Sequence, residues 1–222
     1  MSLNKGEALL LREHESHIKM SEQAYFLNET YRVTFVDENV IIPASLIDQK
    51  GDNFTLNSGQ LIGLNDLILS NDSRIEIRNS TGLIFRLGTH SEFSLEQTVN
   101  GIVPIYFGSV YKTRFSGIPT VMCSGKYRTS CYTQCMNTLF TENISSNKDI
   151  FYGMSDDIHI WEYDENGRRF PIVSIGEGQK VTLQFDNSKP MRERYTVFSI
   201  DMISDDDYDR ITQKFINNKY WR

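Results

Sequence analysis

The stretch Leu64–Phe93 is built from short runs in which apolar and polar residues alternate. Arg74–Arg78 reads Arg-Ile-Glu-Ile-Arg, and Leu83–Leu87 reads Leu-Ile-Phe-Arg-Leu. Alternation with a period of two places one set of side chains on each face of a β-strand. Asn79–Gly82 between the two runs consists of turn-forming residues. The sequence therefore predicts a β-hairpin here.

Runs of strand length recur along the chain, with turn residues about every 8 to 12 positions, which is typical of a sandwich or barrel. Asn166-Gly167 is a strong signal for a second hairpin. Phe and Tyr are frequent, at 13 and 11 residues, and both favour strands. We expect a mainly β fold: an antiparallel β-sandwich or roll of many short strands, with a helix near each terminus. The clearest further strands are Tyr31–Val36, Val103–Phe107, Ser109–Phe115, Ile158–Tyr163, Arg168–Ile175 and Lys180–Phe185.

The two ends of the chain have helical patterns. Lys5–Glu22 is rich in Glu, Leu, Arg and Lys and has no Pro. Near the other end, Ser204 and Asp207 have capping-box spacing, and Tyr208, Ile211 and Phe215 would share one helix face. We therefore divide the chain into an N-terminal helix at 1–24, an all-β domain at 25–186, and a linker with a C-terminal helix at 187–222. Met1-Ser2-Leu3 resembles a start left by an expression vector, so 1–24 is also read as a vector-derived or juxtamembrane segment.

Charge and hydropathy restrict the partners. The net charge is −6 and the pI about 5.3, with no concentrated basic patch, whereas nucleic-acid binding requires one. Spanning a bilayer takes roughly 20 consecutive apolar residues, and no run approaches that length. We expect no nucleic-acid partner, and membrane attachment only through a segment missing from this chain.

A series of short motifs extends over about residues 61–185, and its best-ordered part is Leu64–Phe93. The segments are Leu64–Leu69, Ser73–Ile77, Gly82–Gly88, Ser91 with Phe93, Tyr106–Val110, Tyr127–Ser130, Asn137–Phe140 and Gly178–Val181. In order and spacing these segments resemble the motifs of the FecR-type domain.

The resemblance implies the extracytoplasmic sensor part of a transmembrane anti-sigma-type regulator. Such a domain would be periplasmic or extracytoplasmic, and membrane-anchored in its full-length form. Its partner would be a protein, either a transporter or another signalling component.

Catalytic and metal-binding motifs are missing. We find no Gly-x-Ser-x-Gly elbow, phosphate loop or dinucleotide fingerprint. His14 and His17 could share a helix face and bind a metal together with Glu13. The preferred interpretation is that they are solvent-exposed helix residues. Asp205–Asp209 lacks the EF-hand spacing, and a carboxylate-rich helix start explains it. We expect no enzyme activity, catalytic residue, cofactor or metal.

Three cysteines, Cys123, Cys131 and Cys135, lie within thirteen residues. Their spacing lacks the ligand set of a structural zinc site. We interpret them as buried apolar residues, and a disulfide between Cys123 and Cys131 stays open.

Aromatic residues provide the remaining candidate site. Trp161 and Tyr163 lie two apart on one expected strand, and Phe170 lies on the next. Exposed rings would form an interaction surface, whereas buried rings would belong to the core, which is the default. We expect a non-enzymatic signalling or protein-interaction domain that uses exposed strand edges or loops. The alternative is a carbohydrate-binding or cell-surface structural β-sandwich.

Overall fold

The computed structural model describes residues 30–98, 101–114, 122–125, 132–134, 139–145, 147–155, 157–163, 169–186, 188–190 and 193–221. The described strands form two nine-stranded sheets. The first sheet has the order β18 (Tyr195–Met202), β17 (Gln179–Phe185), β14 (Lys148–Gly153), β13 (Leu139–Ser145), β10 (Val110–Arg114), β7 (Leu83–Leu87), β6 (Ile75–Asn79), β1 (Tyr31–Val36) and β4 (Leu61–Ile62). The second has the order β16 (Arg169–Ile175), β15 (Ile158–Tyr163), β12 (Tyr132–Gln134), β11 (Met122–Gly125), β9 (Gly101–Phe107), β8 (Glu92–Thr98), β5 (Leu67–Leu69), β2 (Ser45–Ile47) and β3 (Asn53–Thr55). The predicted fold class, mainly β with many short antiparallel strands, is confirmed.

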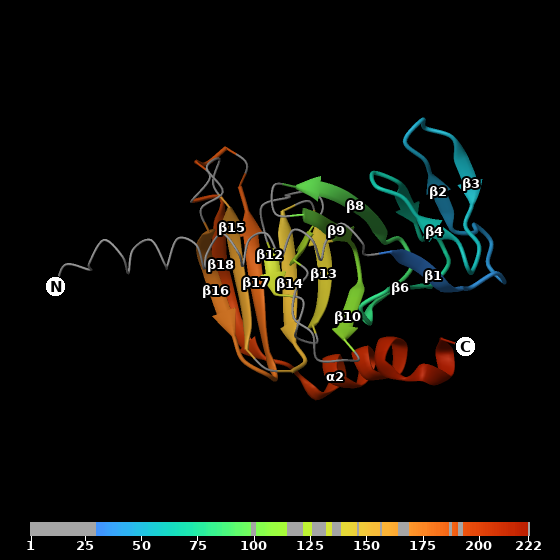
Figure 1. Ribbon diagram of the computed structural model, residues 1–222. Helices are drawn as coiled ribbons and strands as arrows, with labels where there is room; N and C mark the ends of the chain where they lie inside the picture. Colours follow the sequence, from blue (N-terminus) through green and yellow to red (C-terminus); the bar gives the residue numbers. More distant parts are fainter. Residues whose placement is uncertain are drawn as a thin grey trace, which may run out of the picture.

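The chain adds strands to the two sheets in turn (Figure 1). Hairpin β6–β7 lies in the first sheet, β8–β9 in the second, β13–β14 in the first and β15–β16 in the second. Among the described strand pairs only β9 and β11 run parallel. Both sheets therefore grow in the same direction along the sequence, so late strands end up at one end of the molecule.

The hairpin predicted from Arg74–Leu87 is present as β6 and β7, with Ile77 opposite Phe85. Asn79 organises the turn through its side-chain oxygen. Asn79 Oδ1 accepts hydrogen bonds from Thr81 N at 3.1 Å and Leu83 N at 2.7 Å. Gly82 supplies a positive φ of 92°, which residues with a Cβ rarely adopt. The second predicted hairpin is present as β15 and β16, while its turn lies outside the described residues.

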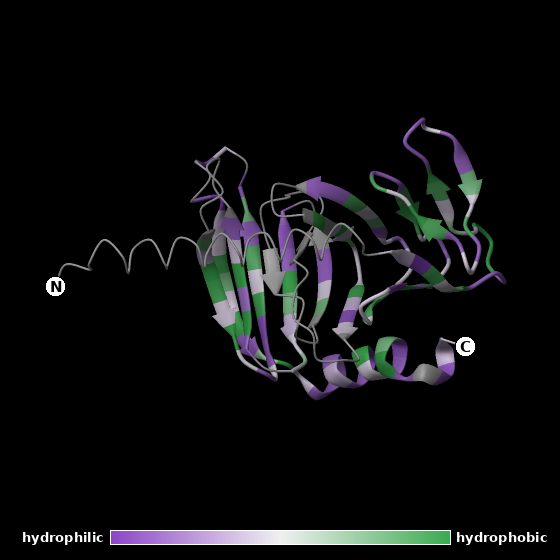
Figure 2. Ribbon diagram, in the orientation of Figure 1, coloured by the Kyte–Doolittle hydropathy of each residue, from purple (hydrophilic) through white to green (hydrophobic). Residues whose placement is uncertain are grey.

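Two apolar clusters fill the space between the sheets, consistent with the alternating green and purple along the strands in Figure 2. The larger lies where the early strands meet and includes edge-to-face contact of Phe85 with Phe93, at 5.1 Å between ring centroids. The smaller includes Phe151, Ile160 and Val181 from late strands.

A C-terminal helical segment covers the outer face of the first sheet. It comprises α2 (Asp205–Ile211), the π-helix η3 (Thr212–Ile216) and the 3-10 helix η4 (Asn218–Tyr220). The predicted cap is present, because Ser204 Oγ accepts a hydrogen bond from Asp207 N at 3.2 Å. Of the three residues predicted to share a helix face, Ile211 and Phe215 are buried, whereas Tyr208 is exposed.

The sequence assigns 187–222 to a linker and a C-terminal helix and predicts no strand there. Strand β18 lies in this range and pairs with all of β17, from Phe185–Tyr195 to Gln179–Met202. The alternation in β18 is interrupted at Val197-Phe198, which hid the strand in the sequence. The first sheet thus continues beyond the expected domain boundary.

The helix predicted at residues 1–24 lies outside the described residues. Within the described part of the chain, no helix has both the length and the apolar character needed to cross a bilayer.

Candidate functional site

Strand β18 lies at one edge of the first sheet as described, with β4 at the other edge, and β17 is the described strand that pairs with it. It carries four apolar side chains with large solvent exposure: Val197 at 38%, Ile200 at 48%, Phe198 at 63% and Met202 at 68%. An edge strand with apolar side chains offers a template for another strand, and native edges are usually protected by charges, prolines or short length. Strand β18 has little of that protection, because it is eight residues long and Asp201 is its one charged side chain.

The pairing with β17 explains which way these side chains point. Ile200 lies opposite Val181, and Val197 lies opposite Leu183, whose side chains are 0% and 1% exposed in the core. Directly opposed residues share a face of the sheet. Val197 and Ile200 therefore continue the core face of the sandwich out to its end, where they are only partly covered.

Phe198 is an extra residue in this strand, since the register shifts between the pairs Thr182–Ser199 and Leu183–Val197. This β-bulge turns Phe198 to the outer face. There the Lys148 ammonium lies 4.5 Å from the centre of its ring, a cation–π contact. The edge thus presents apolar side chains on both faces.

The sequence predicts an aromatic interaction surface at Trp161 and Tyr163 on β15 and Phe170 on β16. Trp161 is 2% exposed, so its ring belongs to the core and does not contribute to an accessible row. Phe170 is half-buried, and the side chain of Tyr163 lies outside the described residues. An interaction surface at Phe170 and Tyr163 stays a prediction.

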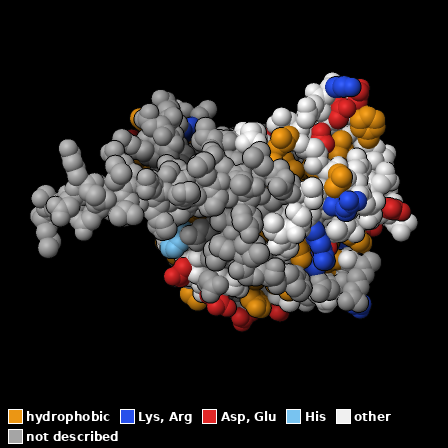
Figure 3. Space-filling view, in the orientation of Figure 1, with side chains coloured by type: hydrophobic (Ala, Val, Ile, Leu, Met, Phe, Trp, Pro, Cys, Tyr) orange, Lys and Arg blue, Asp and Glu red, His pale blue; other side chains and the backbone are white. Residues whose placement is uncertain are grey.

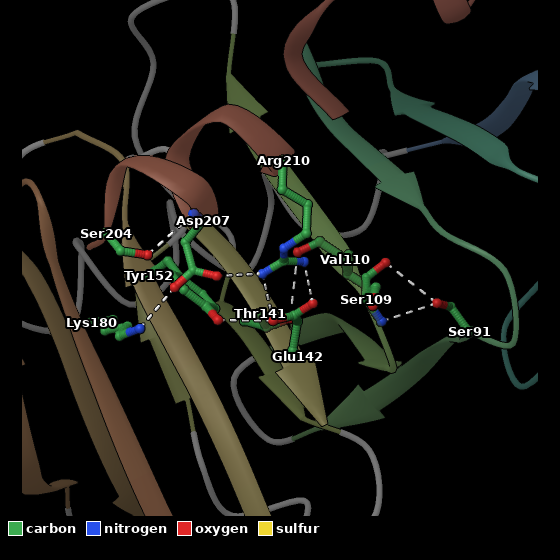
Figure 4. A network of polar contacts seen from close by, with 10 residues as sticks. All are labelled: Ser91, Ser109, Val110, Thr141, Glu142, Tyr152, Lys180, Ser204, Asp207 and Arg210. Carbon is green, nitrogen blue, oxygen red and sulfur yellow. Dashed lines mark hydrogen bonds and ion pairs between the residues drawn. The ribbon is translucent and has the colours of Figure 1, made fainter. Parts of the chain in front are cut away.

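A polar network fastens α2 to the first sheet (Figure 4). Arg210 donates from Nη1 to Glu142 Oε1 at 2.6 Å and from Nη2 to Glu142 Oε2 at 3.0 Å. Asp207 accepts from Lys180 Nζ at 2.7 Å and from Arg210 Nη2 at 3.0 Å. Tyr152 Oη donates to Glu142 Oε2 at 2.8 Å.

The ionisation of this network reflects those contacts. Burial disfavours the charged form of Asp207. Hydrogen bonds from Lys180 and Arg210 nevertheless hold the pKa of this carboxyl group below its usual value. Burial and the neighbouring Glu142 raise the pKa of the Tyr152 phenol above its ordinary value. Asp207 therefore stays ionised and Tyr152 stays protonated near neutral pH, so the network fits a structural clamp better than acid–base chemistry.

A second polar contact holds the far end of the helical segment. Arg86 donates from Nη1 to the carbonyl oxygens of Phe215 at 2.6 Å and Ile216 at 3.1 Å, and from Nε to Glu76 Oε2 at 2.8 Å. A cation at the C-terminal carbonyls of a helix is favourable. The Arg86 guanidinium also lies 5.2 Å from the centre of the Trp221 ring.

Among the residues that the structure describes, Lys112 on β10 is a fully buried lysine. Burial lowers its pKa to about 7. Neighbouring Tyr111 packs with Ile211 and Phe215 in an apolar cluster beneath the C-terminal helical segment, whereas Lys112 alternates to the opposite face. A buried lysine with such a pKa can act as a nucleophile, but only where a substrate can reach it.

Other candidate groups do not converge on a site. Within the described ranges, no three His, Cys, Asp or Glu side chains are placed to hold a metal ion. Asp205–Asp207 form the first turn of α2, as the sequence predicts. His14, His17, Cys131 and Cys135 lie outside the described residues, as does the Cys123 side chain.

The described surface in the view of Figure 3 mixes apolar, acidic and basic side chains without one dominant sign. Sequence comparison with family models and with curated proteins, and comparison with solved structures, finds no match. The β18 edge, which lies in a range where the sequence predicts no strand, is the strongest candidate site.

Proposed function

We propose that this chain is a non-enzymatic protein-interaction domain that binds its partner by strand addition at the β18 edge. The observation that supports this most is the exposure of Val197, Phe198, Ile200 and Met202, between 38% and 68%, on one outermost strand. In strand addition, main-chain hydrogen bonds supply affinity and alternate side chains supply specificity.

The cellular role is proposed from the FecR-type resemblance alone. The domain would work outside the cytoplasm, with a transporter or another signalling component as its partner. The long β18 edge fits this role because protein contact, rather than small-molecule chemistry, is what such a sensor needs. The carbohydrate-binding alternative loses support, since Trp161 is buried.

Site-specific photo-crosslinking tests the proposal. A photoreactive residue at Ile200 or Met202 in the full chain, expressed in its native organism, is expected to capture a distinct protein. The matched control is Phe54, which is 49% exposed on β3. Strand β3 is an edge strand of the second sheet and lies at the other end of the molecule from β18 (Figure 1). The captured protein is then purified and titrated with the parent chain and with Ile200→Asp, which should weaken binding about tenfold or more.

Equal capture from Phe54 and Ile200 would contradict the proposal, as would unchanged affinity of the Ile200→Asp variant. Circular dichroism of that variant checks that the sheet is intact.

A further inference from the structure

The β-bulge makes β18 symmetric about the midpoint between Phe198 and Ser199. Tyr195, Val197, Ile200 and Met202 lie opposite Phe185, Leu183, Val181 and Gln179, respectively, and so share the core face. Thr196, Phe198, Ser199 and Asp201 lie on the outer face. The order of core-facing and outer residues is therefore the same when read in either direction. In a strand without a bulge, two residues at equal distances from a point between neighbours lie on opposite faces. Such a strand therefore could not have this symmetry.

The backbone follows the same symmetry. Arg194 O accepts from Asp186 N at 2.8 Å, and Ile203 N donates to Gly178 O at 2.7 Å, so both residues direct these groups toward β17. Alternation on each side of the bulge then directs the N–H and C=O groups of Val197, Ile200 and Met202 away from β17. These are the same residues whose side chains lie on the core face.

We infer that β18 pairs antiparallel with β18 of a second copy of this chain, with Val197 opposite Ile200 of the second copy. This inference rests on the proposed function, because it names the partner of the same edge. In this register Tyr195 lies opposite Met202 of the second copy, so every core-face pair is apolar. The first sheets of the two copies become one continuous sheet around a two-fold axis.

The exposed side chains favour this occupant. An isologous contact requires a surface that complements itself, and the 48% exposed Ile200 meets the 38% exposed Val197 twice in the dimer. Asp201 lies opposite Thr196 of the second copy, so no like charges face each other. A single strand pair buries less surface than a standard stable interface, so the dimer is expected to dissociate on dilution.

Sedimentation velocity of the full chain over a range of concentrations tests the inference. We expect a reversible monomer–dimer equilibrium that Ile200→Asp and Met202→Asp each weaken about tenfold or more. The matched control Phe54→Asp should leave the equilibrium unchanged. A chain that stays monomeric up to about 1 mM overturns the inference. Equal weakening by Phe54→Asp overturns it too, because it indicates end-to-end association.

Disulfide trapping tests the register without placing a charge on the edge. The Val197→Cys/Ile200→Cys variant should form a covalent dimer under mild oxidation, because opposed residues lie about 5.5 Å apart between Cα atoms. The Val197→Cys/Met202→Cys variant, whose cysteines are offset by two residues, should form much less. The parent chain controls for its own three cysteines. Equal trapping in both variants, or in the parent, contradicts the proposed register.

The two proposals fail separately. If the chain is monomeric but Ile200 still captures a different protein, self-pairing is wrong and the proposed function stands. If the dimer forms but no other protein is captured, strand addition at β18 stands with the second copy as its occupant, and the proposed transporter or signalling partner is wrong.

Discussion

Arg210 holds Glu142 with two hydrogen bonds, of 2.6 and 3.0 Å, between residues 68 apart in the sequence. This pair joins α2 to β13 and therefore ties the end of the chain to the middle of the first sheet. A bidentate pair of this kind is stronger than a single exposed ion pair.

The coupling of Arg210 to Glu142 can be measured with a double-mutant cycle. We expect Arg210→Ala and Glu142→Ala to show a coupling of about 1 to 2 kcal/mol in urea unfolding. The side chains are 31% and 21% exposed, which keeps the value below that of a buried pair. A coupling near zero would mean that apolar packing alone holds the helix.

Removal of Arg86 is expected to be more costly. Arg86→Met leaves the Glu76 carboxylate, 2% exposed, without one of its two arginine partners, and also leaves two helix carbonyls without their donor. We expect a loss of about 3 kcal/mol in the free energy of unfolding. The control Arg78→Met removes the other arginine, which is 49% exposed, and should cost less than about 1 kcal/mol. Equal losses of unfolding free energy in the two variants would show that the buried Arg86–Glu76 contact stabilises the chain no more than the exposed Arg78–Glu76 contact.

Lys112 should make stability depend on pH. Its pKa is about 7 in the folded chain and near 10.5 when unfolded. Between these values the unfolded chain binds more protons, so the free energy of unfolding should rise as pH rises from about 7 to 10.5. Lys112→Met should flatten this rise and stabilise the chain at pH 6. Lower stability of the variant at every pH would show that the amino group makes essential contacts in the interior.

Gly88 directly follows β7 and lies close to Phe215 of the C-terminal helical segment. A Cβ built there would lie 3.1 Å from Phe215 Cζ and 3.2 Å from Ser109 Cβ. We expect Gly88→Ala to cost about 1 to 2 kcal/mol in thermal or urea unfolding. If the cause is crowding of Phe215, Gly88→Ala should cost less in a Phe215→Leu background. Additive effects of the two changes would refute that cause.

Local patterns predicted much of the secondary structure. Tyr31–Val36 is a strand over its full predicted length, and the Asn79–Gly82 turn joins two strands as expected. Ser204 caps the last helix through Asp207 N. These features depend on side-chain alternation, turn residues and caps within about ten residues, so the sequence contains the physical information that determines them.

The candidate edge could not be found in this way. Val197-Phe198 interrupts the alternation of β18, and the sequence predicts no strand in this range. Pairing with β17 over seven registered positions overrides the weak local signal, because strand propensity depends on neighbouring strands. The burial of Trp161 could not be predicted either, because the alternation of its strand does not determine which face lies in the core.

The hairpin at Arg74–Leu87 and the capped C-terminal helix were determined by the sequence itself, through interactions among near neighbours. The tertiary structure decided that β18 lies at the edge, that Lys112 is buried and that Arg210 meets Glu142. Each of these depends on the order in which strands enter two sheets, and that order is a property of long-range packing that no local pattern encodes.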